Sequence, residues 1–169
     1  TKFSTVMVNH AGQLISLVST LPNQFVKEAL MNKELPMLNK FSLVRPEITV
    51  GRHRFDFLLT DENGEDFYLE VKSVTFVENQ VAQFPDAVTL RGKKHVLALK
   101  KLVEKNKKAG VLFVCQRPDA TSFKPMWKRD NKFCYALKEA FESGVKVWCI
   151  TLNISNTEIT YNQEIPIKL

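Results

Sequence analysis

Two runs of alternating residues joined by an Asn-Gly turn constrain the fold of this chain most. RHRFDFLLT (52–60) and FYLEVKSV (67–74) each place apolar residues at every second position. A period of two is the period of a β-strand with different faces. Asn63-Gly64 lies between the two runs and is a strong short-range hairpin signal. The sequence therefore predicts an antiparallel hairpin, and SLVRPEITV (42–50) adds a third strand before it.

The register of this hairpin decides which side chains face each other. A two-residue loop would pair Asp56 with Val71, whereas a three-residue loop, with Gly64 as a left-handed bulge residue, would pair Asp56 with Glu70. We favour the second register because both strands then keep a consistent alternation. It predicts one apolar face, made of Phe55, Phe57, Leu59, Phe67, Leu69 and Val71. The other face would carry Arg54, Asp56, Tyr68, Glu70 and Lys72.

The favoured register brings two carboxylates, Asp56 and Glu70, opposite each other. Like charges directly opposite on a sheet destabilise it, and a bound cation would remove the conflict. Mg²⁺ takes one or two carboxylates together with water and phosphate oxygens. Lys72, on the same face, could then assist an attacking water or stabilise charge on a phosphate. Glu-x-Lys alone is more often an idle surface pattern, so the hypothesis depends on Asp56 and on the turn.

The rest of the chain predicts helices around a mixed sheet. Residues 23–35 repeat apolar positions at helical spacing between Pro22 and Pro36, and a long amphipathic helix should run from about Asp86 to Lys108, with Asp86 as its N-cap. Further elements are an apolar strand at 111–115, a helix at 131–143 capped by Asp130, and two final strands at 145–154 and 157–161. The expected class is α/β or α+β, in one domain spanning residues 1–169.

Positive charge is concentrated in one part of the chain. The whole sequence has 24 Lys and Arg against 18 Asp and Glu, a net charge of +6. Between Arg91 and Lys132 there are 13 Lys and Arg and only 3 Asp and Glu. A one-sided positive field favours a polyanionic partner such as nucleic acid, although lysine-rich helix faces are often only solvated.

Composition favours a cytoplasmic protein without membrane segments. No apolar run approaches the roughly 20 residues that a membrane helix needs, and no secretory signal opens the chain. Cys115, Cys134 and Cys149 are widely spaced among apolar neighbours, which predicts reduced core thiols. Because the chain begins at Thr1, we expect a fragment or a processed product. The sequence leaves the oligomeric state open.

Longer motifs resemble a known family. An acid in a helix, an Asp on one strand and Glu-x-Lys on the next, in the order αβββαβ, is similar to the restriction-endonuclease-like core of the PD-(D/E)XK nuclease superfamily. EVKSVTF followed by FPDAVTLRGKKH resembles more narrowly the sugar fermentation stimulation protein A (SfsA) family. The resemblance runs from about Leu17 to the C-terminus. The last helix and strands are then additions to the core.

The resemblance implies roles for individual residues. Asp56 and Glu70 would bind Mg²⁺ or Mn²⁺, Lys72 would be the catalytic lysine, and Glu28 would be the helix acid near the metal. Arg91 and His95, four residues apart on one helix face, would reach the neighbouring phosphate, and two lysines between them would add to DNA binding, namely Lys93 and Lys94. Members of the family are similar in carrying an N-terminal OB-like barrel, which this chain mostly lacks.

Two main hypotheses for function follow. The first is a DNA-binding, metal-dependent phosphodiester hydrolase of endonuclease type. The second is a catalytically inactive, non-specific DNA-binding regulator of sugar metabolism genes, as the resemblance also implies. A structural domain with purely solubilising charges is a third reading. Trp127 in FKPMWKR could stack on a base or simply pack over the core, and His10 and His53 are expected to be incidental.

Overall fold

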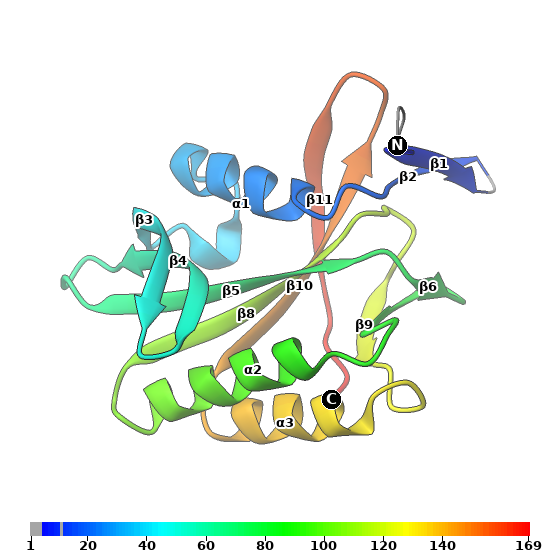
Figure 1. Cartoon of the computed structure of the whole chain (residues 1–169). Coiled ribbons are helices and arrows are strands. Elements are labelled where there is room, and N and C mark those ends of the chain that lie inside the picture. Colours follow the sequence, from blue (N-terminus) through cyan, green and yellow to red (C-terminus); the bar gives the residue numbers. More distant parts are fainter. Residues whose placement is uncertain (1–4, 11) are drawn as a thin grey trace.

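A six-stranded mixed sheet organises the structure. The computed structural model describes residues 5–10 and 12–169 (Figure 1). The strands of this sheet are β3 (Ser42–Val50), β4 (His53–Thr60), β5 (Asp66–Val74), β8 (Lys108–Cys115), β10 (Lys146–Ile154) and β11 (Ile159–Ile165). Their order is β11-β10-β8-β5-β4-β3, with β5, β8 and β10 parallel and the other neighbours antiparallel. The predicted mixed sheet is confirmed.

Helices cover both faces of this sheet. α1 (Leu21–Asn32) lies on one face, and α2 (Leu90–Val103) and α3 (Asn131–Glu142) lie side by side on the other (Figure 1). A short 3-10 turn, Pro36–Leu38, follows α1. The predicted order αβββαβ with an additional helix and strands is therefore present. None of the helices in the described part of the chain is both long and apolar enough to cross a membrane.

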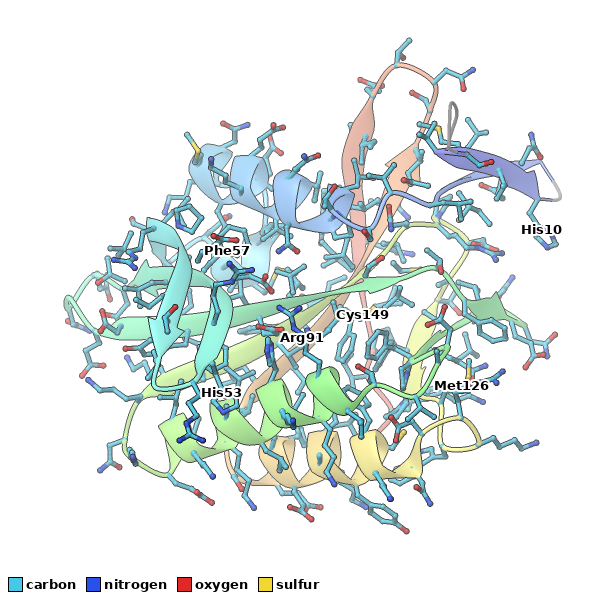
Figure 2. All side chains as sticks on the ribbon, in the orientation of Figure 1. His10, His53, Phe57, Arg91, Met126 and Cys149 are labelled. Atoms are coloured by element: carbon cyan, nitrogen blue, oxygen red, sulfur yellow. The ribbon has the colours of Figure 1, made fainter. Side chains whose placement is uncertain are left out.

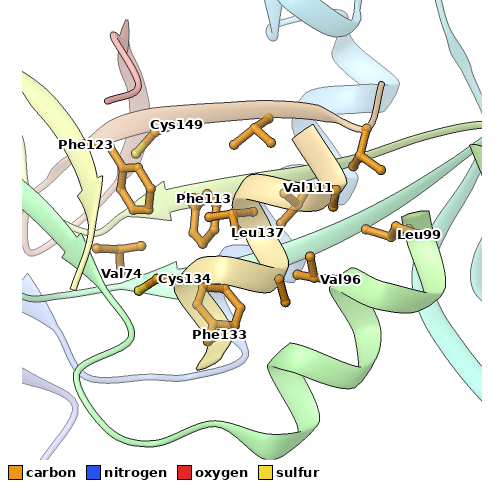
Figure 3. Packing of buried hydrophobic residues seen from close by; sticks show 14 of the residues in the cluster. Val74, Val96, Leu99, Val111, Phe113, Phe123, Phe133, Cys134, Leu137 and Cys149 are labelled. Carbon is orange, nitrogen blue, oxygen red and sulfur yellow. The ribbon is translucent and has the colours of Figure 1, made fainter. Parts of the chain in front are cut away.

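Two apolar layers separate the sheet from its helices. On the α1 side, Val26 and Leu30 are buried against Leu69 and Leu112. On the other side, α2 and α3 pack on β8, as Figure 3 shows for residues that include Val96, Leu99, Val111, Phe113, Phe133 and Leu137. Alternate residues of β8 enter each layer, which explains its continuous apolar run. Cys115, Cys134 and Cys149 are buried and free, as predicted.

The hairpin between β4 and β5 has the register that the sequence favoured. Phe57 pairs with Leu69 and Thr60 with Asp66, which is the three-residue-loop register. The Asp61 N–H donates to the Glu65 carbonyl at 3.1 Å, and Gly64 has a φ of +76°. Glycine accepts this left-handed conformation at little cost, so the loop closes with Gly64 as the bulge residue.

One face assignment within the hairpin was wrong. Phe55 does not share the layer of Phe57 but lies on the α2 side, with its ring centroid 6.3 Å from Tyr68 and 6.1 Å from His95. The pairing of β4 with β5 ends at Phe57, and the remaining part of β4 continues only with β3. A two-stranded ribbon twists more than a wide sheet. The side chains of this part of β4 therefore no longer alternate between the two faces of the main sheet, and Phe55 turns to the α2 side.

The start of α2 also differs from the prediction. Asp86 is exposed and does not cap the helix, which spans Leu90–Val103 rather than 86–108. Thr89 is the N-cap and accepts from the Gly92 N–H at 3.0 Å. Asp130 caps α3 as predicted, accepting from the Phe133 N–H at 3.0 Å. Its second oxygen accepts from the Thr89 N–H at 2.8 Å, so one carboxylate joins the starts of both helices.

Three short strands beside the main sheet were not predicted. β6 (Val77–Glu78) and β7 (Val81–Phe84) form a tight hairpin through Asn79 and Gln80, both with positive φ. β7 pairs in parallel with β9 (Ser122–Pro125). A further short pairing agrees in part with the sequence, since the apolar run at 13–20 predicts a strand paired with residues 3–8, of which 3 and 4 lie outside the described residues, and the structure pairs β1 (Met7–His10) with β2 (Gln13–Ser16). Strands of two to four residues leave too few positions for a periodic pattern, and the β7–β9 pairing joins segments distant in sequence.

Replacing Asp130 by Ala should destabilise the fold. The substitution removes the acceptor of two backbone N–H groups, those of Phe133 and Thr89. A lost cap and an unpaired buried donor together correspond to about 2–4 kcal/mol. Urea unfolding measures this change. Asp86→Ala is the control and should change the free energy of unfolding by less than about 0.5 kcal/mol; an equal loss in both variants would contradict the capping role.

Candidate functional site

Asp56 fills the fork at which β4 separates from β5. Phe57 and Leu69 are the last paired residues of the ladder at this end, and Asp56 lies just beyond them. Its Oδ2 accepts from the Val71 N–H at 2.7 Å, and its Oδ1 accepts from Asn23 Nδ2 of α1 at 2.7 Å. The carboxylate thus replaces a missing strand partner and also holds the first turn of α1.

Glu70 is the most buried charged side chain of the site. The residue is 2% exposed, and its Oε1 contacts Nδ1 of His95 at 2.5 Å and also the Lys72 ammonium. Its Oε2 is buried and has no hydrogen-bond partner among the described residues. Buried carboxylate oxygens are seldom left unpaired, because the desolvation cost is then uncompensated. This oxygen is therefore available to a ligand that the polypeptide itself does not supply.

The two carboxylates have opposite electrostatic environments. Burial, and then the charge of Glu70, raises the pKa of Asp56, and these effects exceed the opposing ones of the Val71 N–H, Lys72 and Asn23. Burial alone would also raise the pKa of Glu70. The hydrogen bond with His95 and the Lys72 ammonium outweigh it, so the net pKa of Glu70 is lowered. Perturbed carboxylates of this kind are typical of functional sites.

The predicted meeting of Asp56, Glu70 and Lys72 occurs, but with a different geometry for Asp56. Glu70 contacts both Lys72 of its own strand and His95 of α2. Asp56 instead lies in the gap between the strands and contacts α1, from which it still interacts electrostatically with Glu70 and Lys72. Because the two strands separate here, Asp56 is bound by α1 on one side of the sheet while Glu70 is bound by α2 on the other.

Glu28 is not brought into this group. It is exposed and lines a groove with Phe25 and Ile159, away from the fork. Residues five apart on a helix differ by about 140° in direction, so the helix face that presents Asn23 to Asp56 turns Glu28 elsewhere. Within the described residues there is no group of three or more His, Cys, Asp or Glu placed to hold a metal ion.

The basic residues of α2 divide by exposure. Arg91 and Lys94 are exposed and Lys93 is half-buried, whereas His95 is buried against Glu70. In the view of Figure 2, Arg91 extends from α2 in the direction of α1. Among the described residues Arg91 makes no ion pair, and neither Asp86 nor Glu78 neutralises it. His95 is placed to position Glu70 rather than to be reached freely from solvent.

Two residues near the site were missed from the sequence. Asn23 carries no motif that marks it as the partner of Asp56. His53, labelled in Figure 2, was expected to be incidental, but β4 places its ring edge-on to that of His95, with centroids 6.1 Å apart. Neither neighbour could be found from periodicity, because both contacts join elements that are separate in the sequence.

The donor atoms suit a hard divalent cation. Asp56 and Glu70 offer carboxylate oxygens, including the unpaired Oε2 of Glu70, and no thiol lies among the contacts of either. Mg²⁺, Mn²⁺ and Ca²⁺ prefer oxygen ligands, and Mg²⁺ commonly uses only one or two carboxylates with water completing the shell. The residues therefore fit a site of this type.

Comparisons with known proteins agree on one family. A family model described as the sugar fermentation stimulation protein RE domain matches residues 20–158. Homologs of the sugar fermentation stimulation protein from Clostridium botulinum (strain Alaska E43 / Type E3) and Clostridium novyi (strain NT) are 41% and 38% identical over 169 residues, covering all of this chain and 74% of each relative.

A solved structure gives the same result for the fold. The structure of Pyrococcus furiosus SfsA in complex with Ca²⁺ superimposes with a TM-score of 0.91 and 28% sequence identity, covering 97% of this chain and 71% of that chain. The chain belongs to the sugar fermentation stimulation protein (SfsA) family.

Proposed function

We propose that this chain is a metal-dependent phosphodiester hydrolase of endonuclease type that acts on DNA. The observation that carries the proposal is the buried, unpaired Oε2 of Glu70, a carboxylate close enough to Asp56 to raise its pKa, with the Lys72 ammonium on the other oxygen of Glu70. An acidic pair with an adjacent lysine is the arrangement that the resemblance to PD-(D/E)XK nucleases implies, and both lines of argument select the same three residues.

Asp56 and Glu70 would hold the metal. We propose Mg²⁺ or Mn²⁺, and the Ca²⁺ named for the SfsA structure of Pyrococcus furiosus supports a hard-cation site in this family. Such an ion supplies Lewis-acid stabilisation of the negative charge that develops on a phosphate during hydrolysis. Asn23 and the Val71 N–H hold the Asp56 carboxylate, and His95 holds that of Glu70, so both ligands are positioned in advance.

Positively charged side chains would bind the phosphate and orient the water. Hydrolysis adds water across one P–O bond and yields a phosphomonoester and a free hydroxyl. Lys72 is half-buried next to Glu70, where its ammonium can stabilise charge on the phosphate and orient the water. Arg91, exposed and one helical turn from His95, provides a second positive charge for the DNA backbone, with Lys93 and Lys94 beside it.

The second candidate is a DNA-binding regulator that cuts nothing. The observation in its favour is that Glu70 already has two partners within the protein, Lys72 and His95, so part of the negative charge is neutralised without a metal. Calorimetric titration separates the two candidates. Salt-sensitive DNA binding without any uptake of Mg²⁺ or Mn²⁺ would favour the regulator.

Plasmid nicking tests the hydrolase directly. We expect nicking with Mg²⁺ or Mn²⁺ and none with EDTA. Lys72→Ala should lower the rate at least about 100-fold, because a positioned acid–base or charge-stabilising group contributes that much. Lys101→Ala, which removes an exposed lysine farther along α2, is the control for charge and should nick normally. Equal rates for wild type and Lys72→Ala would remove Lys72 from the mechanism.

Asp56→Asn should separate metal binding from stability. Thermal unfolding of the wild type should shift upward with excess Mn²⁺, and the variant should lose this shift because a metal ligand is gone. Without metal the variant should melt at a higher temperature than wild type. The reason is that the charged form of Asp56 is disfavoured in the folded protein.

The difference in melting temperature between wild type and Asp56→Asn should depend on pH. Because the folded pKa of Asp56 is raised, the destabilisation is complete above that pKa and disappears as the pH falls below the ordinary value of 3.8. The melting temperatures of wild type and Asp56→Asn should therefore converge in acid. A variant that is less stable than wild type at neutral pH would contradict the electrostatic account.

A further inference from the structure

We propose that a pocket separate from the carboxylates binds one unpaired nucleotide of the DNA strand. The pocket has a volume of about 560 Å³ and is formed by the β6–β7 hairpin, the end of β9 and the loop that leads to α3. Met126, labelled in Figure 2, marks its position. The proposal rests on the proposed function in that it takes nucleic acid to be the partner of this chain.

The charge of the pocket suits a phosphate. Lys124, Lys128 and Arg129 line it and are exposed, and Glu78 is the one acidic residue in the lining. None of the three cations has an ion-pair partner in the part of the chain that the structure describes. Their charge is therefore not used inside the protein, and a phosphodiester backbone would neutralise it with release of counterions.

Two aromatic side chains make the pocket more than a basic surface. Phe76 is 39% exposed and Trp127 is 37% exposed, and both line the pocket. The ring of Trp127 is held edge-to-face with Tyr135 of α3, with centroids 5.0 Å apart. A held aromatic ring with exposed surface, next to cations, is the combination that stacks an unpaired base in single-strand binding proteins.

Gln83 supplies a hydrogen-bonding group that faces the open pocket. The residue is only 7% exposed and lines the pocket, and its side-chain amide forms no hydrogen bond with any described residue. The amide atoms are not among the buried unpaired atoms of the described residues, so they reach the solvent of the pocket and are open to a partner there. An amide offers both a donor and an acceptor, which match the polar edge of a base.

The pocket lies within reach of the proposed metal site. Phe76 follows Lys72 by four residues, a stretch of chain that spans at most about 14 Å. On the other side, Asp130 follows Arg129 and binds the N-terminus of α2, the helix that carries Arg91. A strand with one phosphate at the carboxylates would therefore have a neighbouring nucleotide near the pocket.

Binding in EDTA tests the pocket apart from cleavage. A fluorescein-labelled 12-nucleotide oligo-dT is the probe, a 12-base-pair duplex is the comparison, and anisotropy is the readout. Trp127→Leu should weaken binding of the single strand about 5- to 150-fold, the range for loss of one base stack. The duplex should be affected less, because its bases are already stacked. Circular dichroism checks that the variant is folded.

A charge variant gives the second readout. The triple variant Lys124→Gln/Lys128→Gln/Arg129→Gln should reduce the slope of log K against log salt by about 2, at ~0.7 for each lost single-strand phosphate contact. The matched control removes three exposed lysines elsewhere, Lys101→Gln/Lys105→Gln/Lys107→Gln, and should retain most of the wild-type slope.

Oligonucleotide binding and plasmid nicking together test the pocket proposal and the hydrolase proposal separately. If Trp127→Leu and the pocket triple variant both bind the oligonucleotide as tightly as wild type, the pocket proposal is overturned even if plasmid nicking is observed. If both variants lose affinity while no nicking occurs with Mg²⁺ or Mn²⁺, the hydrolase fails and the pocket stands.

Discussion

The hydrogen bond from the Val71 N–H to the Asp56 carboxylate is the interaction on which the site depends. A strand that leaves a sheet exposes the backbone groups of its former neighbour, and buried N–H groups are almost always paired. Asp56 supplies the missing acceptor at 2.7 Å, and its other oxygen binds Asn23. One side chain therefore keeps the fork open while fixing the hairpin, α1 and the Glu-x-Lys segment relative to one another.

The fork also produces the electrostatic asymmetry of the site. Glu70 is almost fully buried, yet Lys72 and His95 compensate one of its oxygens, which keeps its pKa low. Asp56 has only neutral hydrogen-bond donors, and burial together with the charge of Glu70 raises its pKa. The folded chain thus holds a buried carboxylate whose negative charge is only partly compensated. A fold that served only stability would gain by replacing it, whereas a cation-binding site requires it.

Sequence reasoning predicted the elements whose cause is local. Alternation gave the strands, Gly64 gave the loop and with it the register, and Asp130 was correctly expected to cap α3. The predictions were wrong where a residue's position depends on contacts with elements distant in the sequence. Phe55 changes layers because β4 twists away from the sheet, and Asp86 loses the N-cap position to Thr89, whose backbone is held by Asp130 from another helix. Glu28 was chosen as the helix acid, but the helix turns Asn23 toward the fork instead.

The sequence by itself determined that Glu70 and Lys72 share one face of a strand, because side chains alternate with a period of two, and that Asp56 comes close to them, because the glycine loop fixes the register. Only the tertiary structure decided which groups complete the site. His95, Asn23 and the unpaired oxygen of Glu70 depend on how two helices dock on opposite faces of the sheet. Helix docking is set by packing of whole apolar layers, and no local pattern encodes which polar residue then faces the fork.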